Sequence, residues 1–509
     1  MYLIYNDAVG TEHYFPKTST NTYEDEDGLG LMGLVTRAVT HDSGWRLAQQ
    51  SSAVYDGYGN KTSSTDVNNI TTTNTYSNHF LTSMQTGNMP TQEYRYTAST
   101  GRMNQTFMSG YAIQHYLYGN GQLSDLSLKG KWSGNDFWQS YHFEYDSFGN
   151  MTRIGVSGAN NDTAQNVGSE NYRTFATYDY GNVIHNGLLQ SMTYGNGNTV
   201  SYEYDIFDRT TKETYNNDVV YNYAYDASGS LNKQWSSTGE EYRYEYDSLG
   251  RLIRSSEYNG GTFAQRTEHI YDESDRLVRQ AWYNGSGATS QTYDYSETNG
   301  LLTKQDVYFP GNTYNATPNA ANNPSVNISY SYDALNRLSS KTTKVNGTTL
   351  FSNALWFAEV SGDSGWRSSQ VKHFNYKRSD NSLIMGFEYG YDANGNIASE
   401  KNSVSGDIQN YIYDGQNQLT KVTNGSDTEL YSYTYDTAGN IRTKTDGSTT
   451  HNYTYGDAQW RDLLTVASCS RNSVGQQKVH EHEASGGVQR EHPRRRLTKF
   501  TGACKRICA

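Results

Sequence analysis

The chain has 509 residues, a formal net charge of -12, 34% hydrophobic residues and a mean hydropathy of -0.84. Such low hydrophobicity is typical of disorder, but the 46 tyrosines and the 14% aromatic content exclude that class. The modest, interspersed charge argues against a broad nucleic-acid-binding surface, and no apolar run is long enough to predict a transmembrane helix.

Residues 1–50 are predicted to form strands and loops that lead into the main body. A short apolar stretch after Met1 gives way at once to Asn6 and Asp7, so no signal peptide is predicted here. Tyrosine, threonine and valine favour a pleated, half-buried surface, where a ring can be buried while its hydroxyl stays hydrated. The composition therefore predicts an all-β protein, whose turns are made mostly by Gly, Asn and Asp because only six prolines are present.

Residues 51–465 contain a repeated Tyr-Asp dipeptide. From Tyr178 onward the intervals between successive copies are 26, 21, 21, 25, 22, 39, 59, 22 and 22 residues. A unit of about 21 residues holds two strands and two turns, so the pattern predicts an array of antiparallel β-hairpins with two insertions. The twelve tyrosines of the pattern are Tyr55, Tyr145, Tyr178, Tyr204, Tyr225, Tyr246, Tyr271, Tyr293, Tyr332, Tyr391, Tyr413 and Tyr435.

The third residue after each repeat aspartate predicts the conformation of the turn. In eleven of the twelve units it is Gly, Asn or Asp, the residue types that most readily adopt a positive φ. The aspartate can accept hydrogen bonds from the backbone two residues on, which is typical of a type I turn closing a bulged hairpin. The unit at Tyr293 departs from the rule, since Glu297 stands at this position and Asn299-Gly300 follows two residues late.

Most units carry an aromatic residue two places before the tyrosine and an aliphatic residue after the turn, as with Tyr244 and Leu252. Because side chains alternate along a strand, the paired aromatics are expected to share one face of the sheet. Each cross-strand pair contributes roughly 0.2 to 1 kcal/mol, so stability is expected to be distributed along the array.

Three units read Tyr-Asp-Ser-Phe-Gly-Asn-Met, Tyr-Asp-Ser-Leu-Gly-Arg-Leu and Tyr-Asp-Thr-Ala-Gly-Asn-Ile, beginning at Tyr145, Tyr246 and Tyr435. These units resemble the repeats of the Rhs, or YD-repeat, family, and the resemblance covers roughly residues 50 to 465. It implies a long sheet that spirals into a hollow β-shell, here a partial one. Such shells occur in bacterial polymorphic toxins, in the cocoon component of insecticidal toxin complexes and in teneurins. The family's shell usually encloses a variable C-terminal toxin domain, or lies on the cell surface or wall.

Two features depart from the family's full pattern. The aspartate-centred self-cleavage core and the terminal motif that closes the shell are both missing from the sequence, so self-processing is not predicted. The segment from Tyr5 to Tyr14 is similar to a strand-turn-strand that precedes the repeats. The sequence is therefore interpreted as a truncated fragment that starts inside a longer protein.

Residues 466–509 differ in composition from the rest of the chain. They contain no tyrosine, nine Lys or Arg against three acidic residues, three histidines and all three cysteines. We interpret this segment as a basic tail that is disordered or translated out of frame. A basic linker and a small toxin tip are the alternatives.

The tail also contains soft metal ligands, and Cys504 and Cys508 have a permissible zinc spacing, but no second pair matches them. No metal site is predicted there. The ligand-type residues of the tail are Cys469, His480, His482, His492, Cys504 and Cys508. The run Arg494-Arg495-Arg496 with Lys499 is interpreted as a solvated basic surface, although phosphate or anionic lipid could bind it.

Asp392, Asn394 and Asn396 are similar to a calcium loop, but Gly395 is misplaced and Ser403 stands where a bidentate glutamate belongs. A structural turn is predicted instead, with weak divalent binding as the alternative.

Catalysis is not predicted. Ser43 and His41 coexist in the sequence, but no nucleophile elbow joins them. The protein is therefore expected to be no enzyme and to need no cofactor.

Four tryptophans admit two interpretations, since an indole can stack on a sugar ring or pack in a core. Core packing is the favoured interpretation. These residues are Trp132, Trp138, Trp282 and Trp356.

The sequence favours a non-catalytic scaffold: a segment of an Rhs/YD-repeat shell that encapsulates or displays a C-terminal toxin or effector. The full-length protein is expected to be secreted or on the cell surface, with no nucleic-acid partner and no membrane span. The alternative is a carbohydrate- or protein-binding cell-wall adhesion module. A degenerate pseudogene product is the third hypothesis.

Overall fold

The computed structural model describes two compact units. Unit 1 consists of Met1–Phe175, Phe357–Gln370 and Glu388–Ala509, and unit 2 of Ala176–Trp356 and Val371–Phe387. Within the described residues all regular structure is β-strand, so the all-β prediction is confirmed. The described residues are 2–6, 12–16, 19–22, 37–41, 47–159, 172–181, 187–284, 287–309, 326–359 and 367–471.

The first strands are β1 (Tyr2–Asn6), β2 (Glu12–Pro16), β3 (Ser19–Thr22), β4 (Arg37–His41), β5 (Leu47–Tyr55), β6 (Lys61–Thr65), β7 (Thr71–Ser77), β8 (Phe80–Thr86), β9 (Gln92–Tyr96), β10 (Met103–Met108), β11 (Ile113–Gly119), β12 (Gln122–Trp132), β13 (Asn135–Tyr145) and β14 (Met151–Ala159). The next are β15 (Arg173–Asp179), β16 (Ser191–Tyr194), β17 (Thr199–Tyr204), β18 (Thr210–Tyr215), β19 (Val219–Tyr225), β20 (Leu231–Ser236), β21 (Glu240–Tyr246), β22 (Leu252–Asn259), β23 (Thr262–Tyr271), β24 (Leu277–Asn284), β25 (Gly287–Tyr295), β26 (Leu302–Tyr308), β27 (Val326–Tyr332), β28 (Leu338–Val345) and β29 (Thr348–Glu359). The last are β30 (Arg367–Arg378), β31 (Leu383–Tyr391), β32 (Ile397–Asn402), β33 (Ile408–Tyr413), β34 (Leu419–Asn424), β35 (Glu429–Tyr435), β36 (Ile441–Asp446), β37 (Thr449–Thr454) and β38 (Val466–Arg471).

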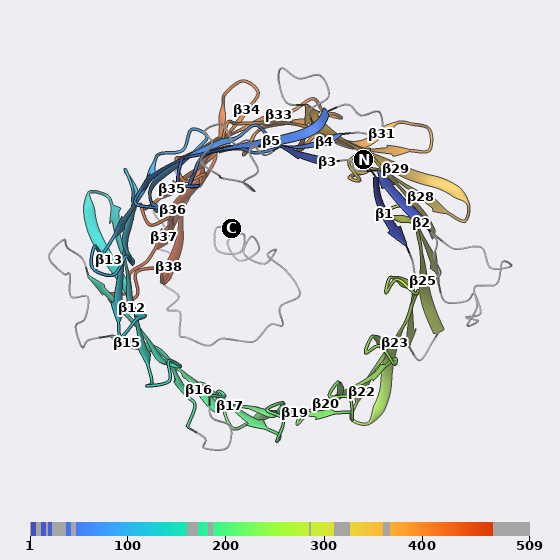
Figure 1. Ribbon diagram of the computed structural model, residues 1–509, viewed down its shortest axis with the longest axis horizontal. Coiled ribbons are helices and arrows are strands. Elements are labelled where there is room, and N and C mark those ends of the chain that lie inside the picture. The colour runs from blue at the N-terminus through green and yellow to red at the C-terminus, as the bar shows by residue number, and fades with distance from the viewer. Residues whose placement is uncertain are drawn as a thin grey trace. The chain divides into compact units, whose positions relative to one another are not determined.

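Neighbours in the sequence are neighbours in the sheet. From β4 to β14, from β15 to β29 and from β32 to β38, each strand pairs antiparallel with the next one along the chain (Figure 1). Consecutive hairpins of this kind need only short turns, which is why one 21-residue unit suffices to add two strands.

The Tyr-Asp turns have the predicted geometry. In the turn between β21 and β22, the carboxylate of Asp247 accepts hydrogen bonds from the backbone N–H groups of Leu249 and Arg251, at 2.9 and 3.0 Å. Gly250 has a φ of 80°, and the register shifts by one residue so that Tyr246 pairs with Leu252. The ten rule-obeying positions that the structure describes all have φ between 60° and 95°, namely Gly59, Gly149, Asp208, Gly229, Gly250, Asp275, Asn336, Gly395, Asn417 and Gly439. The predicted bulged hairpin is confirmed, and Asn182 lies outside the described residues.

The repeat tyrosine connects each hairpin to the one before it. The hydroxyl of Tyr246 donates a hydrogen bond of 2.8 Å to the carbonyl of Leu231, the aliphatic residue that follows the preceding turn. The same bond recurs at 2.6–2.9 Å between Tyr96 and Leu81, Tyr145 and Leu123, Tyr204 and Leu189, Tyr225 and Thr210, Tyr271 and Leu252, Tyr295 and Leu277, Tyr332 and Leu302, Tyr413 and Ile397, and Tyr435 and Leu419. We call this contact the tyrosine clamp. It explains why the repeat requires tyrosine and not another aromatic residue.

One unit uses a different tyrosine from the one that the dipeptide indicates. The clamp is made by Tyr295, whose hydroxyl lies 2.7 Å from the carbonyl of Leu277, and the turn runs on from Ser296 to Gly300, which has a φ of 70°. The unit assigned to Tyr293 is therefore a Tyr-Ser unit, displaced by two residues. A serine hydroxyl replaces the aspartate, so the Tyr-Asp search missed the true position.

Two strands cross the domain boundaries that the sequence suggests. β5 crosses the boundary after residue 50 and pairs with β4, while β38 continues the sheet six residues beyond residue 465 and pairs with β37. A backbone hydrogen-bond ladder does not depend on the composition that marked the boundaries, so a strand can continue past them.

In unit 2 the two faces of the sheet differ in chemistry. Tyr242, Tyr244 and Tyr246 of β21 share one face, as predicted, and Glu241, Arg243 and Glu245 lie on the other. On the charged face, Arg254 bonds to Glu245 at 2.7 Å and to Glu268 at 3.1 Å, across three strands. Exposed pairs like these contribute little stability one by one, so they chiefly favour the correct register and solubility.

Buried apolar residues are few. In unit 2 the buried residues Ala176, Val200, Ala281 and Val307 lie on separate strands, as expected for distributed stability. In unit 1 the buried residues Phe137, Trp138, Val156 and Tyr172 lie in or close to β13–β15. Because side chains alternate along a strand, Phe137 and Trp138 lie on opposite faces of β13, so both faces of the sheet are covered here.

Replacing Tyr246 by phenylalanine removes one clamp while keeping the ring. We expect the free energy of unfolding, measured by urea titration, to fall by about 1 kcal/mol, since the carbonyl of Leu231 loses its donor. The control is Tyr258→Phe on β22, whose ring lies under the Arg243 guanidinium at 4.4 Å. An equal loss in both variants would contradict a special role for the clamp.

Candidate functional site

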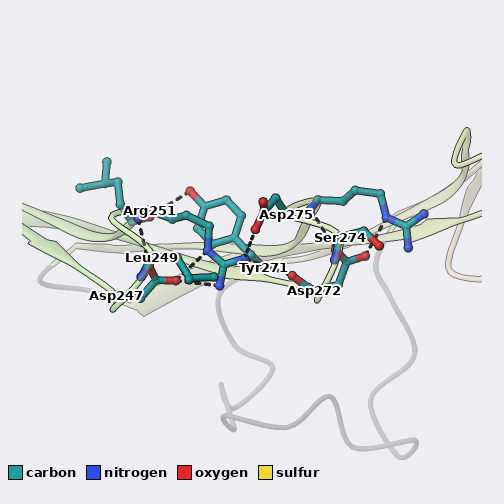
Figure 2. Close-up of polar contacts among 9 residues, drawn as sticks. Asp247, Leu249, Arg251, Tyr271, Asp272, Ser274 and Asp275 are labelled. Atoms are coloured by element: carbon teal, nitrogen blue, oxygen red, sulfur yellow. Dashed lines mark hydrogen bonds and ion pairs between the residues drawn. The ribbon is translucent and has the colours of Figure 1, made fainter. Parts of the chain in front are cut away.

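The Tyr-Asp turns are joined to one another by arginine. Arg251 forms an ion pair with Asp247 of its own turn at 2.7 Å, and its Nη1 reaches the next turn, 2.7 Å from Asp275 and 3.1 Å from the carbonyl of Asp272 (Figure 2). The same guanidinium lies 5.0 Å from the ring centre of Tyr271. One side chain thus holds the aspartate, the tyrosine and the backbone of two successive units.

Arginine recurs at this place in several units. Arg209, Arg276 and Arg337 form ion pairs with Asp205, Asp272 and Asp333. A hydrogen bond from the Arg209 side chain lowers the pKa of Asp205, so this turn keeps its charge well into the acidic range. Other units have asparagine at this position, as where Asn150 donates to Asp146. The candidate functional element is therefore a series of linked turns.

Unit 1 contains two tiers of strands. Tier 1 is β5–β14 and tier 2 is β32–β38, and the turns of tier 2 lie on hairpin ends of tier 1. The backbone N–H of Asn88 donates to the Asn394 side chain at 2.8 Å, and the N–H of Gly415 donates to the Tyr111 hydroxyl at 2.7 Å. The Lys131 N–H bonds to the Thr437 hydroxyl at 2.5 Å. We call this contact the seam.

The seam has a regular register. The bonded partners are separated by 306, 304 and 306 residues in the sequence. Because this separation is nearly constant, each hairpin of tier 2 meets one hairpin of tier 1 in the same order. The chain of unit 1 therefore returns to itself with hairpin-for-hairpin matching.

The close approach at the seam requires a glycine. A Cβ atom on Gly415 would lie 2.6 Å from Cγ of Pro90 and 2.7 Å from the Tyr111 hydroxyl, so any side chain would push the tiers apart. The neighbouring backbones of Ala112 and Thr437 are bonded at 2.9 Å.

The end of the seam is closed by the segment 457–462. Arg173 forms an ion pair with Asp457 at 2.7 Å, and the ring of Trp460 meets Phe175 edge-on at 5.3 Å. The Tyr141 hydroxyl donates to Asp462 at 2.9 Å, and Gln139, fully buried, accepts a hydrogen bond from the Arg461 backbone. This segment therefore covers the face of β13 on which Phe137, Gln139 and Tyr141 lie.

A buried carboxylate lies on the opposite face of the sheet, the face of His142. Asp125, only 3% exposed, accepts hydrogen bonds from His142 Nδ1 at 2.9 Å and from the Tyr172 hydroxyl at 2.8 Å. The rings of His142 and Tyr172 stack at 4.5 Å, and Gly155 leaves the space for Tyr172. In the described ranges no hydroxyl or thiol nucleophile is bonded to His142, so the His–Asp pair anchors Tyr172 to the sheet.

Asp392 begins a turn of the predicted geometry. Its carboxylate accepts hydrogen bonds from the backbones of Asn394 and Asn396, both at 2.9 Å. Among the described residues no group of three or more His, Cys, Asp or Glu side chains is arranged to hold a metal ion. Cys469 lies in β38 and is disulfide-bonded. The other ligand-type residues of the tail, and Arg494 to Lys499, lie outside the described residues.

The tryptophans divide between the two interpretations. Trp138 is 4% exposed, as the core prediction requires, and Trp282 is half-buried. The prediction is wrong for Trp132 and Trp356, which are 37% and 47% exposed. Trp132 ends β12 beside a hairpin turn, where the Arg442 guanidinium covers it at 5.4 Å.

Of the two residues weighed for catalysis, the structure describes one. His41 lies in β4, and Ser43 lies outside the described residues. The seam and the Asp125 cluster were both missed by sequence reasoning, since no local pattern links the residues that they join.

Known families match the repeat region. The Teneurin YD-shell family model matches residues 206–351, and the RHS Repeat model matches residues 185–220, 391–429 and 413–451. No curated protein matches the chain.

Solved structures also resemble it. One is a crystal structure of TcdB2-TccC3-Cdc42, with 13% identity and a TM-score of 0.44 over 83% of this chain and 26% of that one. Another is a Tc holotoxin pore of Photorhabdus luminescens, with 14% identity and a TM-score of 0.36 over 85% of this chain and 26% of that one. The chain thus spans about a quarter of the length of these structures.

The seam should not tolerate a side chain at Gly415. We expect Gly415→Ala to lower the free energy of unfolding by about 1 to 3 kcal/mol, because the added methyl group overlaps Pro90 and Tyr111. Gly119→Ala is the matched control, since its Cβ would meet only Ser124 at an ordinary 3.7 Å. Urea unfolding of both variants tests this, and equal stability would argue against a tight seam.

The seam should also weaken at alkaline pH. Burial, and then the charge of Asp462, raise the pKa of Tyr141 to about 12. A raised tyrosine pKa adds stability that is complete below about pH 10 and is lost as the pH rises through the folded value. The stability difference between the wild type and Tyr141→Phe should therefore shrink between pH 10 and 12, as measured by urea unfolding. A stability difference that stays constant between pH 10 and 12 would contradict a raised pKa of Tyr141 in the folded protein.

Proposed function

Because the chain belongs to the Rhs/YD-repeat family, we propose that it is a non-catalytic wall section of a shell that encapsulates or displays a C-terminal toxin or effector. The effector is a domain of the longer protein, and that protein is secreted or held on the cell surface. Repeats of this family build scaffolds, which supports a structural role without enzymatic activity.

The seam of unit 1 is the observation that carries this proposal. A wall that separates two compartments needs neighbouring tiers to meet without gaps, and the tiers here match hairpin for hairpin through backbone and side-chain hydrogen bonds. The tyrosine clamp and the arginine links join hairpins along each tier. A module built only for adhesion needs neither the matching of hairpins between tiers nor the links between hairpins along a tier.

The chemistry of the sheet is compatible with an aqueous compartment. The tyrosine hydroxyls are bonded, the opposite face is charged, and few side chains are fully buried. No helix in the described part of the chain is both long and apolar enough to cross a membrane.

A second candidate, binding of carbohydrate or protein at a cell wall, is favoured by the exposed indole of Trp356 on β29. Its ring is 4.8 Å from that of His373 and leaves nearly half of its surface open. A glycan array separates the two candidates, because loss of a glycan signal in Trp356→Ala would favour adhesion.

Encapsulation predicts protection of an attached polypeptide. We expect an unstructured reporter, fused after Ala509 of the full chain, to be cleaved by proteinase K at least about tenfold more slowly than the same reporter added separately. Protection should be lost in a Trp460→Ala variant that still gives the β-sheet circular dichroism spectrum, because the end of the seam opens. Equal cleavage of fused and free reporter would refute encapsulation by this chain.

A further inference from the structure

The turn between β8 and β9 places a methionine in the seam. Nδ2 of Asn417, in a turn of tier 2, donates a hydrogen bond to the sulfur of Met89 at 3.4 Å. The two residues are 328 positions apart in the sequence, and both belong to unit 1. A thioether is a weak acceptor, so the bond adds little strength of its own. Its value is that it fixes where the sulfur meets the other tier.

Both sequence neighbours of Met89 take part in the seam. The backbone N–H of Asn88 donates to the Asn394 side chain at 2.8 Å. Pro90 lies so near Gly415 that a Cβ atom there would be 2.6 Å from Cγ of the proline. The methionine is therefore enclosed between two of the closest contacts between the tiers.

The backbone of Met89 is held by its own turn. Its N–H donates to the carbonyl of Thr86 at 3.0 Å, and its carbonyl accepts a hydrogen bond from the Gln85 side chain at 3.1 Å. The side chain cannot draw away from tier 2 by a shift of its backbone unless these bonds break.

The amide of Asn417 is held on the other side of the seam. Its Oδ1 accepts hydrogen bonds from Nδ2 of Asn396 at 2.8 Å and from Nδ2 of Asn394 at 3.3 Å, which directs its own Nδ2 to Met89. Its backbone has a φ of 60°, as the Tyr-Asp turn requires. The distance between the sulfur and the amide is thus set from both tiers.

The sulfur of Met89 can be oxidised in place. The residue is only partly buried, so a small oxidant in the solvent can reach it. A sulfur lone pair attacks one oxygen of hydrogen peroxide, the O–O bond breaks, and after a proton transfer the second oxygen leaves as water. The sulfur loses two electrons, the peroxide gains them, and methionine sulfoxide forms.

The sulfoxide does not fit between the tiers. An oxygen on the Asn417 side would stand between sulfur and nitrogen atoms that are 3.4 Å apart, whereas an N–H···O bond alone takes about 2.9 Å. An oxygen on the other side leaves a partly positive sulfur facing the N–H group, which repels it. In both cases the contact is lost, and a flexible apolar side chain becomes polar beside Pro90 and Gly415.

We propose that Met89 is a site of reversible oxidation by peroxides, and that its sulfoxide opens the seam between the β8–β9 turn and the turns of tier 2. Methionine sulfoxide reductases reverse the change, because a dithiol supplies two electrons, the sulfoxide oxygen leaves as water and a disulfide forms. The proposal concerns the seam and stands whether or not the shell encloses an effector.

Hydrogen–deuterium exchange of the full chain, followed by mass spectrometry, tests the proposal. After treatment with hydrogen peroxide we expect the seam amides of Asn88 and Gly415 to exchange at least about tenfold faster, since their bonds across the seam open. Peptides from β21 and β22 of unit 2 should exchange as before. The two reductases for the two sulfoxide epimers, with dithiothreitol, should restore slow exchange. Dithiothreitol alone is the control, because Cys469 is disulfide-bonded.

Three variants separate Met89 from the other methionines. Met89→Leu keeps an apolar side chain of similar volume without sulfur, so its seam should not respond to peroxide. Met84→Leu, in β8 of the same hairpin, is the matched control and should respond like the wild type. Met89→Gln places a permanent polar group at the seam and should exchange faster without any peroxide.

Met385, which lies in unit 2 and is 40% exposed, serves as the reference for the extent of oxidation. Circular dichroism verifies that every variant is folded. A Met89 that stays unoxidised while Met385 is fully oxidised would overturn the proposal. Unchanged seam exchange in protein that carries the Met89 sulfoxide, or an equal response of Met89→Leu to peroxide, would also overturn it.

Discussion

The hydrogen bond from the repeat tyrosine to the carbonyl of the preceding hairpin is the interaction on which the rest of the structure depends. A two-stranded hairpin is marginally stable alone in water, and this protein buries few apolar side chains on which a core could be built. Each clamp joins one hairpin to the next at a fixed position, as between Tyr246 and Leu231. The sheet can then grow by identical steps, with stability that accumulates along the chain.

The clamp also determines what surrounds it. Because the tyrosine hydroxyl must reach back over the preceding turn, the ring lies beside the turn, and an arginine can lie over it while binding the aspartate, as Arg251 does (Figure 2). The turn aspartate is thus fully engaged by backbone N–H groups and one cation.

The seam adds a second level of organisation. Along a tier, neighbouring hairpins are joined by strand pairing, but between tiers only turns and strand ends meet, so specificity depends on the residues at the tips. Gly415 permits close approach, whereas Phe148 at the equivalent edge of tier 1 projects into solvent. The size of the residue next to the aspartate, as at Gly415, therefore limits how closely the two tiers can approach.

The sequence by itself determined the all-β class, the hairpin unit and the conformation of its turns, because these depend on local spacing and on which residues adopt a positive φ. The sequence misplaced one unit, at Tyr293, since the turn of that unit begins with Ser296 in place of an aspartate. Only the tertiary structure decided the seam, the cluster around Asp125 and the exposure of Trp132. These contacts join residues that are often some 300 positions apart, and no local pattern encodes which tip will meet which hairpin after the chain has returned to itself.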